Sequence, residues 1–100
     1  MRPGSQIAQA LHAFREFIAD HPELENAWYT NSNYIAILAA RDEEELVRLI
    51  SRAEKKGAKF SVFREPDLDN QITAVAIEPG IKGRKLTSCY PLALKNCEVK

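Results

Sequence analysis

Apolar side chains recur every three or four positions between residues 5 and 20, a spacing typical of the buried face of an α-helix. The break at Pro3-Gly4, followed by the Ser5 hydroxyl as a cap, predicts that the helix begins there. Pro22 ends or restarts it. We therefore predict a helix over residues 5–20 and a short helical turn over residues 23–29.

A second helix is indicated by signals at both of its ends. Asp42 is a good N-terminal cap, and Glu45 three residues later completes a box-like start. Gly57 is a typical stop, and Lys55 and Lys56 suit the negative end of the helix dipole just before it. This predicts a helix from about residue 43 to residue 56.

Three further segments read as strands. Residues 34–40 are apolar throughout, as in a strand covered on both faces, whereas residues 59–63 alternate and residues 73–77 are apolar after Thr73. Because a strand–helix–strand unit almost forces parallel pairing, we expect segments 34–40 and 59–63 to be parallel neighbours. Residues 86–94 are ambiguous, because Pro91 allows either a short edge strand with a helical turn or an irregular tail.

Together these elements predict one α/β domain over residues 1–100, with a small mixed, mostly parallel sheet of three or four strands and helices on its faces. The 45% apolar and 28% charged content is that of an ordinary soluble domain, and no apolar run is long enough for a membrane span. Cys89 and Cys97 are too few for a disulfide scaffold, so we expect reduced thiols in a cytoplasmic protein.

The charges cancel overall, with fourteen basic and fourteen acidic residues, so no net field draws the chain to nucleic acid. Two basic clusters stand out locally. Lys55, Lys56 and Lys59 are best explained by the helix dipole, and the run from Lys82 to Lys85 by a solvated turn. The chain has no phosphate-binding loop, dinucleotide fingerprint or zinc-ligand spacing, so we expect no cofactor.

The polar loop 64–71 carries the first candidate chemistry. Glu65, Asp67 and Asp69 are oxygen ligands suited to a hard cation, but no His or Cys accompanies them, and we favour no metal. A carboxylate that performs acid–base chemistry at the strand end is the better hypothesis, because ligands gather at strand ends in such sheets. Arg64 beside Glu65 is by itself an exposed ion pair of little energy.

The second candidate is the polar stripe of the first helix, which carries Ser5, Gln9 and His12. A Ser–His pair can serve nucleophilic chemistry, but it needs an orienting third group, and two helical turns separate Ser5 from His12 by roughly 10 Å. From the residues alone, the favoured interpretation is a solvated helix face.

Two stretches resemble the peptidyl-tRNA hydrolase 2 family. Residues 3–13, Pro-Gly-Ser-Gln-Ile-Ala-Gln-Ala-Leu-His-Ala, are similar to that family's helix opening, Gly-Lys followed by an Ala-Gln pair and then His-Ala. Residues 33–80 repeat its order of strand, Asp-Glu-Glu-Glu-Leu helix, Lys-Lys-Gly, strand, loop and Thr-Ala-Val-Ala-Ile strand. The family cleaves the ester joining a peptide to tRNA.

The resemblance implies roles for individual positions. The family's helix-start lysine falls on Ser5, its glutamine and histidine on Gln9 and His12, its acidic residue on Glu65 or Asp67, and its strand-opening threonine on Thr73. The family's Gly-Arg-Thr loop is absent and shortened to residues 67–71. The resemblance thus implies that Glu65 or Asp67 orients water with Thr73 and His12 in the catalytic set, while Ser5, Gln9 and Arg64 contact substrate.

Three functions follow as hypotheses: recognition and hydrolysis of peptidyl-tRNA, in which the basic clusters meet tRNA phosphates; a non-catalytic tRNA- or protein-binding module on the same scaffold; and a protein adaptor that uses an open sheet edge. The family also has a strand before its first helix, where this chain has only Met1 and Arg2. An unfilled place in a sheet leaves unpaired backbone groups, so we predict a homodimer or an altered sheet.

Overall fold

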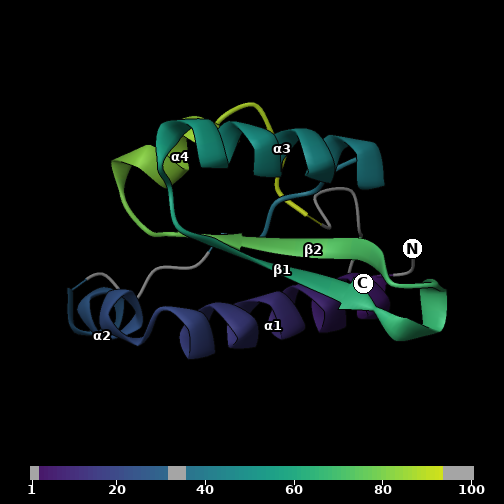
Figure 1. Cartoon of the computed structure of the whole chain (residues 1–100), viewed down its shortest axis with the longest axis horizontal. Helices are drawn as coiled ribbons and strands as arrows, with labels where there is room; N and C mark the ends of the chain where they lie inside the picture. The colour runs from purple at the N-terminus through teal and green to yellow at the C-terminus, as the bar shows by residue number, and fades with distance from the viewer. Residues whose placement is uncertain (1–2, 32–35, 94–100) are drawn as a thin grey trace, which may run out of the picture.

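The computed structural model describes residues 3–31 and 36–93, which form a two-stranded sheet between two layers of helices. α1 lies against one face of the sheet with α2 beside it, and α3 lies against the other face with α4 beside it (Figure 1). In chain order the elements are α1 (Pro3–Asp20), α2 (Pro22–Asn31), α3 (Glu43–Lys56), β1 (Phe60–Glu65), the short 3₁₀ helix η1 (Pro66–Leu68), β2 (Gln71–Ile77) and α4 (Ile81–Thr87). The α/β class and the helices on the sheet faces agree with the prediction.

The direction and size of the sheet differ from the prediction. Within the described residues β1 and β2 form one antiparallel pair, so the predicted mostly parallel sheet of three or four strands is wrong there. The physical reason lies in the connecting loop, where Asp69 and Asn70 adopt φ angles of 55° and 61°. Asp and Asn tolerate this left-handed region better than other non-glycine residues, and the two together turn the chain back on itself.

The apolar segment 34–40 is not a parallel neighbour of β1. Residues 34 and 35 lie outside the described part, and in residues 36–40 Leu38 makes one isolated antiparallel bridge, to Leu92. Two backbone hydrogen bonds of 2.8 Å hold this bridge, from Ala39 N to Pro91 O and from Ala93 N to Ile37 O. A cavity of about 720 Å³ is lined by both this segment and β2, which has a strand neighbour on one edge only among the described residues.

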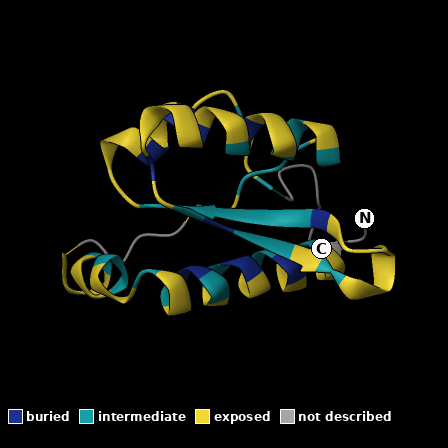
Figure 2. Ribbon diagram, viewed as in Figure 1, coloured by how far each residue is buried: buried dark blue, intermediate teal, exposed yellow. Residues whose placement is uncertain are grey.

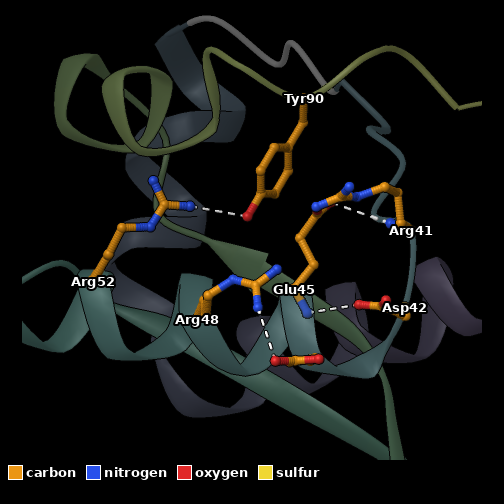
Figure 3. A network of polar contacts seen from close by, with 7 residues as sticks. Arg41, Asp42, Glu45, Arg48, Arg52 and Tyr90 are labelled. Carbon is orange, nitrogen blue, oxygen red and sulfur yellow. Dashed lines mark hydrogen bonds and ion pairs between the residues drawn. The ribbon is translucent and has the colours of Figure 1, made fainter.

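Both predicted ends of α3 are confirmed. Asp42 Oδ1 accepts the Glu45 backbone N–H at 2.9 Å, and Gly57 ends the helix in the left-handed region at φ 70°. The Glu45 carboxylate in turn accepts from Arg41 Nε at 2.8 Å and from the Arg41 backbone N–H at 3.1 Å (Figure 3). These hydrogen bonds lower the pKa of Glu45 below its ordinary value and raise the pKa of Arg41.

The core is thin and lies on both faces of the sheet (Figure 2). On the α3 and α4 side a cluster of four buried residues packs with partly buried aromatic and aliphatic neighbours; its members are Leu49, Ala53, Ala58 and Leu86. On the other side Ala13 and Phe17 of α1 are buried. Most of β2 is only half-buried, although it lies between two helical layers.

The basic run at residues 82–85 is helical rather than the solvated turn predicted from sequence, since it lies inside α4. Gly83 explains how α4 sits so close to the sheet: a Cβ atom there would collide with the backbone carbonyl oxygen of Glu78. Across residues 3–31 and 36–93, no helix has both the length and the apolar character needed to cross a membrane.

Candidate functional site

Helix α1 lies along β1 and runs in the opposite direction. Near the C-terminal end of α1, Asp20 accepts a 2.7 Å hydrogen bond from the Ser61 hydroxyl. Two residues farther along β1, the ring of Phe63 stacks on His12, with 4.6 Å between ring centroids and 17° between planes. Since side chains two residues apart share a face of a strand, Glu65 faces the same helix one step farther on.

Beside Glu65, three polar side chains from α1, β1 and β2 are joined by hydrogen bonds, and we call this group the Gln9 network. Gln9 Nε2 donates to Glu65 Oε1 at 3.1 Å, and the Thr73 hydroxyl donates to Gln9 Oε1 at 2.8 Å. Gln9 is only 9% exposed, and Glu65 and Thr73 are half-buried. Because both ends of the Gln9 amide are engaged, its orientation is fixed.

Thr73 reaches Gln9 from an irregular point in the sheet. Phe63 pairs with Ala74 and Arg64 pairs with Ile72, so Thr73 between them has no opposite residue on β1. This is a β-bulge, which bends a strand and re-aims the side chain of the extra residue. The Thr73 side chain is thus directed towards α1 by the sheet's irregularity rather than by its regular alternation.

Glu43 holds the bulge from the opposite face. It lies in the first turn of α3, and its Oε2 accepts a 2.8 Å hydrogen bond from the backbone N–H of Ile72. Sequence reasoning missed this residue because an acid at a helix start is fully explained by the dipole. No local signal separates Glu43 from Glu44 beside it, which instead pairs with Arg48 on the surface.

The other residues predicted for the site are more exposed. His12 is exposed on α1 apart from its stack on Phe63, and Ser5 is exposed one turn before Gln9. Asp67 is exposed in η1, while Arg64 donates to the backbone oxygen of Asn70 at 3.3 Å. Within residues 3–31 and 36–93, neither Asp67 nor Arg64 hydrogen-bonds to the Gln9 network.

The solvated-face interpretation of the α1 stripe therefore fails at Gln9, which is buried, and holds at Ser5 and His12. The acidic loop residues do not gather: in the described part of the chain no three His, Cys, Asp or Glu side chains are placed to hold a metal ion together. Cys89 is exposed and free, and Cys97 lies outside the described residues.

A comparison with family models now bears on this arrangement. The model of Peptidyl-tRNA hydrolase PTH2 matches residues 1–87. The chain belongs to the PTH2 family. The PTH2 match ends at Thr87 and so spans every element from α1 to α4, including all three residues of the Gln9 network. No curated protein matches the sequence.

Membership of the PTH2 family suggests a peptidyl-tRNA hydrolase-like function and, through the family's name, peptidyl-tRNA as the substrate class. The site geometry is compatible with ester chemistry. The Thr73 hydrogen is directed at Gln9, so the lone pairs of its oxygen remain as acceptors, and Glu65 is a half-buried carboxylate close by. The stacked rings of His12 and Phe63 border this pair along α1.

Proposed function

We propose that this chain hydrolyses the ester that joins a peptide to tRNA, with Glu65 and Thr73 held at the reacting centre by Gln9. The observation that carries the proposal is the single Gln9 amide hydrogen-bonded to both groups, across 56 and 64 residues of sequence. An amide locked between a carboxylate and a hydroxyl fixes two hydrogen-bond acceptors relative to each other, which is the preorganisation that a reacting water needs.

The attacking water is held by two acceptors. One of its hydrogens is directed at the Glu65 carboxylate and the other at the Thr73 oxygen, so a lone pair is left for the ester carbonyl carbon. As the new carbon–oxygen bond forms, Glu65 takes the water's proton. The bond to the tRNA sugar oxygen then breaks, and the same proton passes to that oxygen, giving a peptide carboxyl group and a tRNA hydroxyl.

The remaining residues have supporting roles in this proposal. His12, stacked beside the centre, borders the peptide or the terminal base, and Ser5 lines the site one turn earlier on α1. Arg64, which contacts the hairpin turn, is proposed to meet substrate from the loop side. Asp67 is the alternative to Glu65 as the carboxylate that orients water, and we favour Glu65 because it contacts Gln9.

The test is release of a labelled amino acid from N-acetylated aminoacyl-tRNA. Glu65→Gln keeps the shape of the side chain and removes the proton acceptor, so we expect kcat to fall by roughly a hundredfold or more. Asp67→Asn is the matched control, an equal change two residues away on the exposed η1 helix, and should retain the wild-type rate. Wild-type protein that releases nothing above the buffer rate would overturn the proposal.

A non-catalytic binding module is the second candidate, and one observation favours it. The first turn of α1 carries no cation, because Ser5 stands where the resemblance puts the family's lysine. The same assay separates the two candidates: binding of the tRNA substrate without release of the amino acid supports the module, whereas release above background excludes it.

We extend the proposal to assembly and location. Two copies associate through the edge of β2 that has no strand neighbour in the described part of the chain, because an open edge is a template for pairing. The protein acts in the cytoplasm, where peptidyl-tRNA is made, and its exposed thiol Cys89 fits a reducing compartment.

A further inference from the structure

Cationic side chains from two helices line one pocket on the α3 and α4 face of the molecule. The pocket has a volume of about 460 Å³, and its lining consists of Arg52, Lys55, Lys56, Lys82, Lys85 and Leu86. In sequence these residues form two separate clusters thirty residues apart, each of which has an ordinary explanation by itself. The fold brings both clusters to one place, and we call this place the basic pocket.

Helix geometry explains why the five charges converge. Positions 52, 55 and 56 are three and four residues apart on α3, so their side chains share one face, and Lys82 and Lys85 do the same on α4. Leu86 is buried in the cluster that joins the two helices. Gly83, beside Lys82, lets α4 approach the sheet end closely. The convergence therefore follows from how α4 packs.

Ordinary surface electrostatics does not account for this pocket. The helix dipole of α3 favours cations at its own end but gives no reason for two lysines of α4 to face them. No acidic side chain lines the pocket, and within residues 3–31 and 36–93 none of the four lysines forms an ion pair. Five like charges repel one another unless an anion lies between them.

One of the five cations is already held in place. Arg52 donates from Nη2 to the Tyr90 hydroxyl at 2.9 Å, and its guanidinium carbon lies 5.9 Å from the centre of the Tyr90 ring (Figure 3). A guanidinium that is already fixed loses less conformational freedom on binding an anion than a mobile one does. Its planar set of N–H donors also matches the oxygens of a phosphate better than an ammonium group does. The four lysines add charge around it.

We infer that the basic pocket binds the phosphate backbone of an RNA. This place is apart from the proposed reacting centre at Glu65 and Thr73, which we call the Glu65 centre. Five cations exceed the charge of one phosphate and match several consecutive phosphodiesters. The pocket is lined by residues of α3 and α4, and Gln9 belongs to α1. These helices lie on opposite sides of the sheet (Figure 1). The contact therefore anchors the body of the RNA rather than its reacting end. The choice of RNA as the polyanion rests on the proposed function.

The test uses the whole chain and a fluorescent tRNA without an attached amino acid, so that binding is measured in the absence of any ester. Binding is followed by anisotropy between about 50 and 200 mM salt. The variant is Lys82→Gln with Lys85→Gln. The matched control, Lys59→Gln with Arg84→Gln, also removes two exposed charges, one of them on α4, but from outside the pocket.

We expect the pocket variant to bind roughly tenfold more weakly and to lose about two from the magnitude of the slope of log K against log salt, whereas the control keeps wild-type values. Equal weakening of the pocket variant and the control would overturn the inference, because it would indicate diffuse attraction. Full displacement of tRNA by an equal concentration of inorganic phosphate would also overturn it, and so would equal affinity for a polyglutamate peptide.

A second readout locates the contact and does not depend on a substitution. Addition of a short RNA duplex should shift the backbone amide signals of Lys82, Lys85 and Leu86 in an NMR spectrum, and unchanged signals at saturating RNA would contradict the inference. Failure of the proposed function is distinguishable, because a chain that hydrolyses nothing can still show this binding. If the chain is active, the pocket variant should raise KM and leave kcat unchanged.

Discussion

At the scale of single residues, Gln9 is the hydrogen-bonding centre of the candidate site, and its sequence context conceals this. It stands in a polar stripe beside Ser5 and His12, which predicts a solvated face, yet it is 9% exposed. Its partners Glu65 and Thr73 are 56 and 64 residues away. Periodicity along one helix contains no information on such partners, and only the family resemblance pointed to them.

The Thr73 hydroxyl should contribute to stability as well as to the site. In Thr73→Val the Gln9 carbonyl oxygen keeps its buried position and loses its donor, which costs roughly 1–2 kcal/mol of unfolding free energy. Thr73→Ser retains the hydroxyl and is the matched control. Urea unfolding of the two variants measures the difference, and equal midpoints would show that the 2.8 Å hydrogen bond contributes nothing.

The choice between Glu65 and Asp67 also belongs to this scale. Both fit the family pattern, and alternation along the loop could not separate them. The two residues differ in local structure: Glu65 ends β1 on the face towards α1, whereas Asp67 lies in η1 after Pro66. The proline begins a 3₁₀ turn and ends the alternation of the strand, so the two carboxylates do not share one side.

At the scale of elements, α3 was predictable from sequence because its signals are local. Its cap at Asp42, its stop at Gly57 and its buried stripe each depend on residues within a few positions of one another. The strands were less predictable. An apolar run such as residues 36–40 fits an extended segment, but its partner is a distant stretch of chain, here Leu92, which nothing in the run specifies.

The packing of α4 gives a sharp test at this scale. Helix propensity alone favours Gly83→Ala by about 1 kcal/mol, but the new Cβ would collide with the backbone oxygen of Glu78, which cannot swing away. Overpacking costs about 1–3 kcal/mol, so the collision should prevail and the variant should unfold at lower urea. Gly4→Ala, with open space around it in α1, is the control and should be neutral or slightly stabilising.

A Gly83→Ala protein that equals or exceeds Gly4→Ala in stability would contradict the close packing of α4 on the end of β2. The same variant also bears on the basic pocket. Any shift of α4 moves Lys82 and Lys85 relative to α3, so its tRNA affinity should fall together with its stability.

At the scale of the whole molecule, the sheet is small for the helices that surround it. β2 lies between two helical layers and still has half-buried side chains along most of its length, next to the 720 Å³ cavity. A two-stranded sheet by itself is at best marginally stable, so the helices provide most of the packing. The predicted larger sheet failed because it required a strand partner that the described chain does not supply.

The open edge of β2 leads to the prediction of a dimer. Light scattering on the eluting peak of a sizing column should give about twice the chain mass of 11.3 kDa at micromolar concentrations, decreasing on dilution. A mass of one chain at every concentration would contradict pairing through this edge, and would not affect the proposals for the Glu65 centre or the basic pocket.

The antiparallel docking of α1 on β1 has a consequence for how the proposed activity would be lost. Its contacts at Ser61, Phe63 and Glu65 tie the start of the chain to its middle, and no short loop holds the two together once they part. Loss of the proposed hydrolysis on heating should therefore track the melting of this one helix, rather than proceed through an intermediate in which only the candidate site is loosened. Hydrogen exchange would report the same event as amides of α1 and β1 opening in concert.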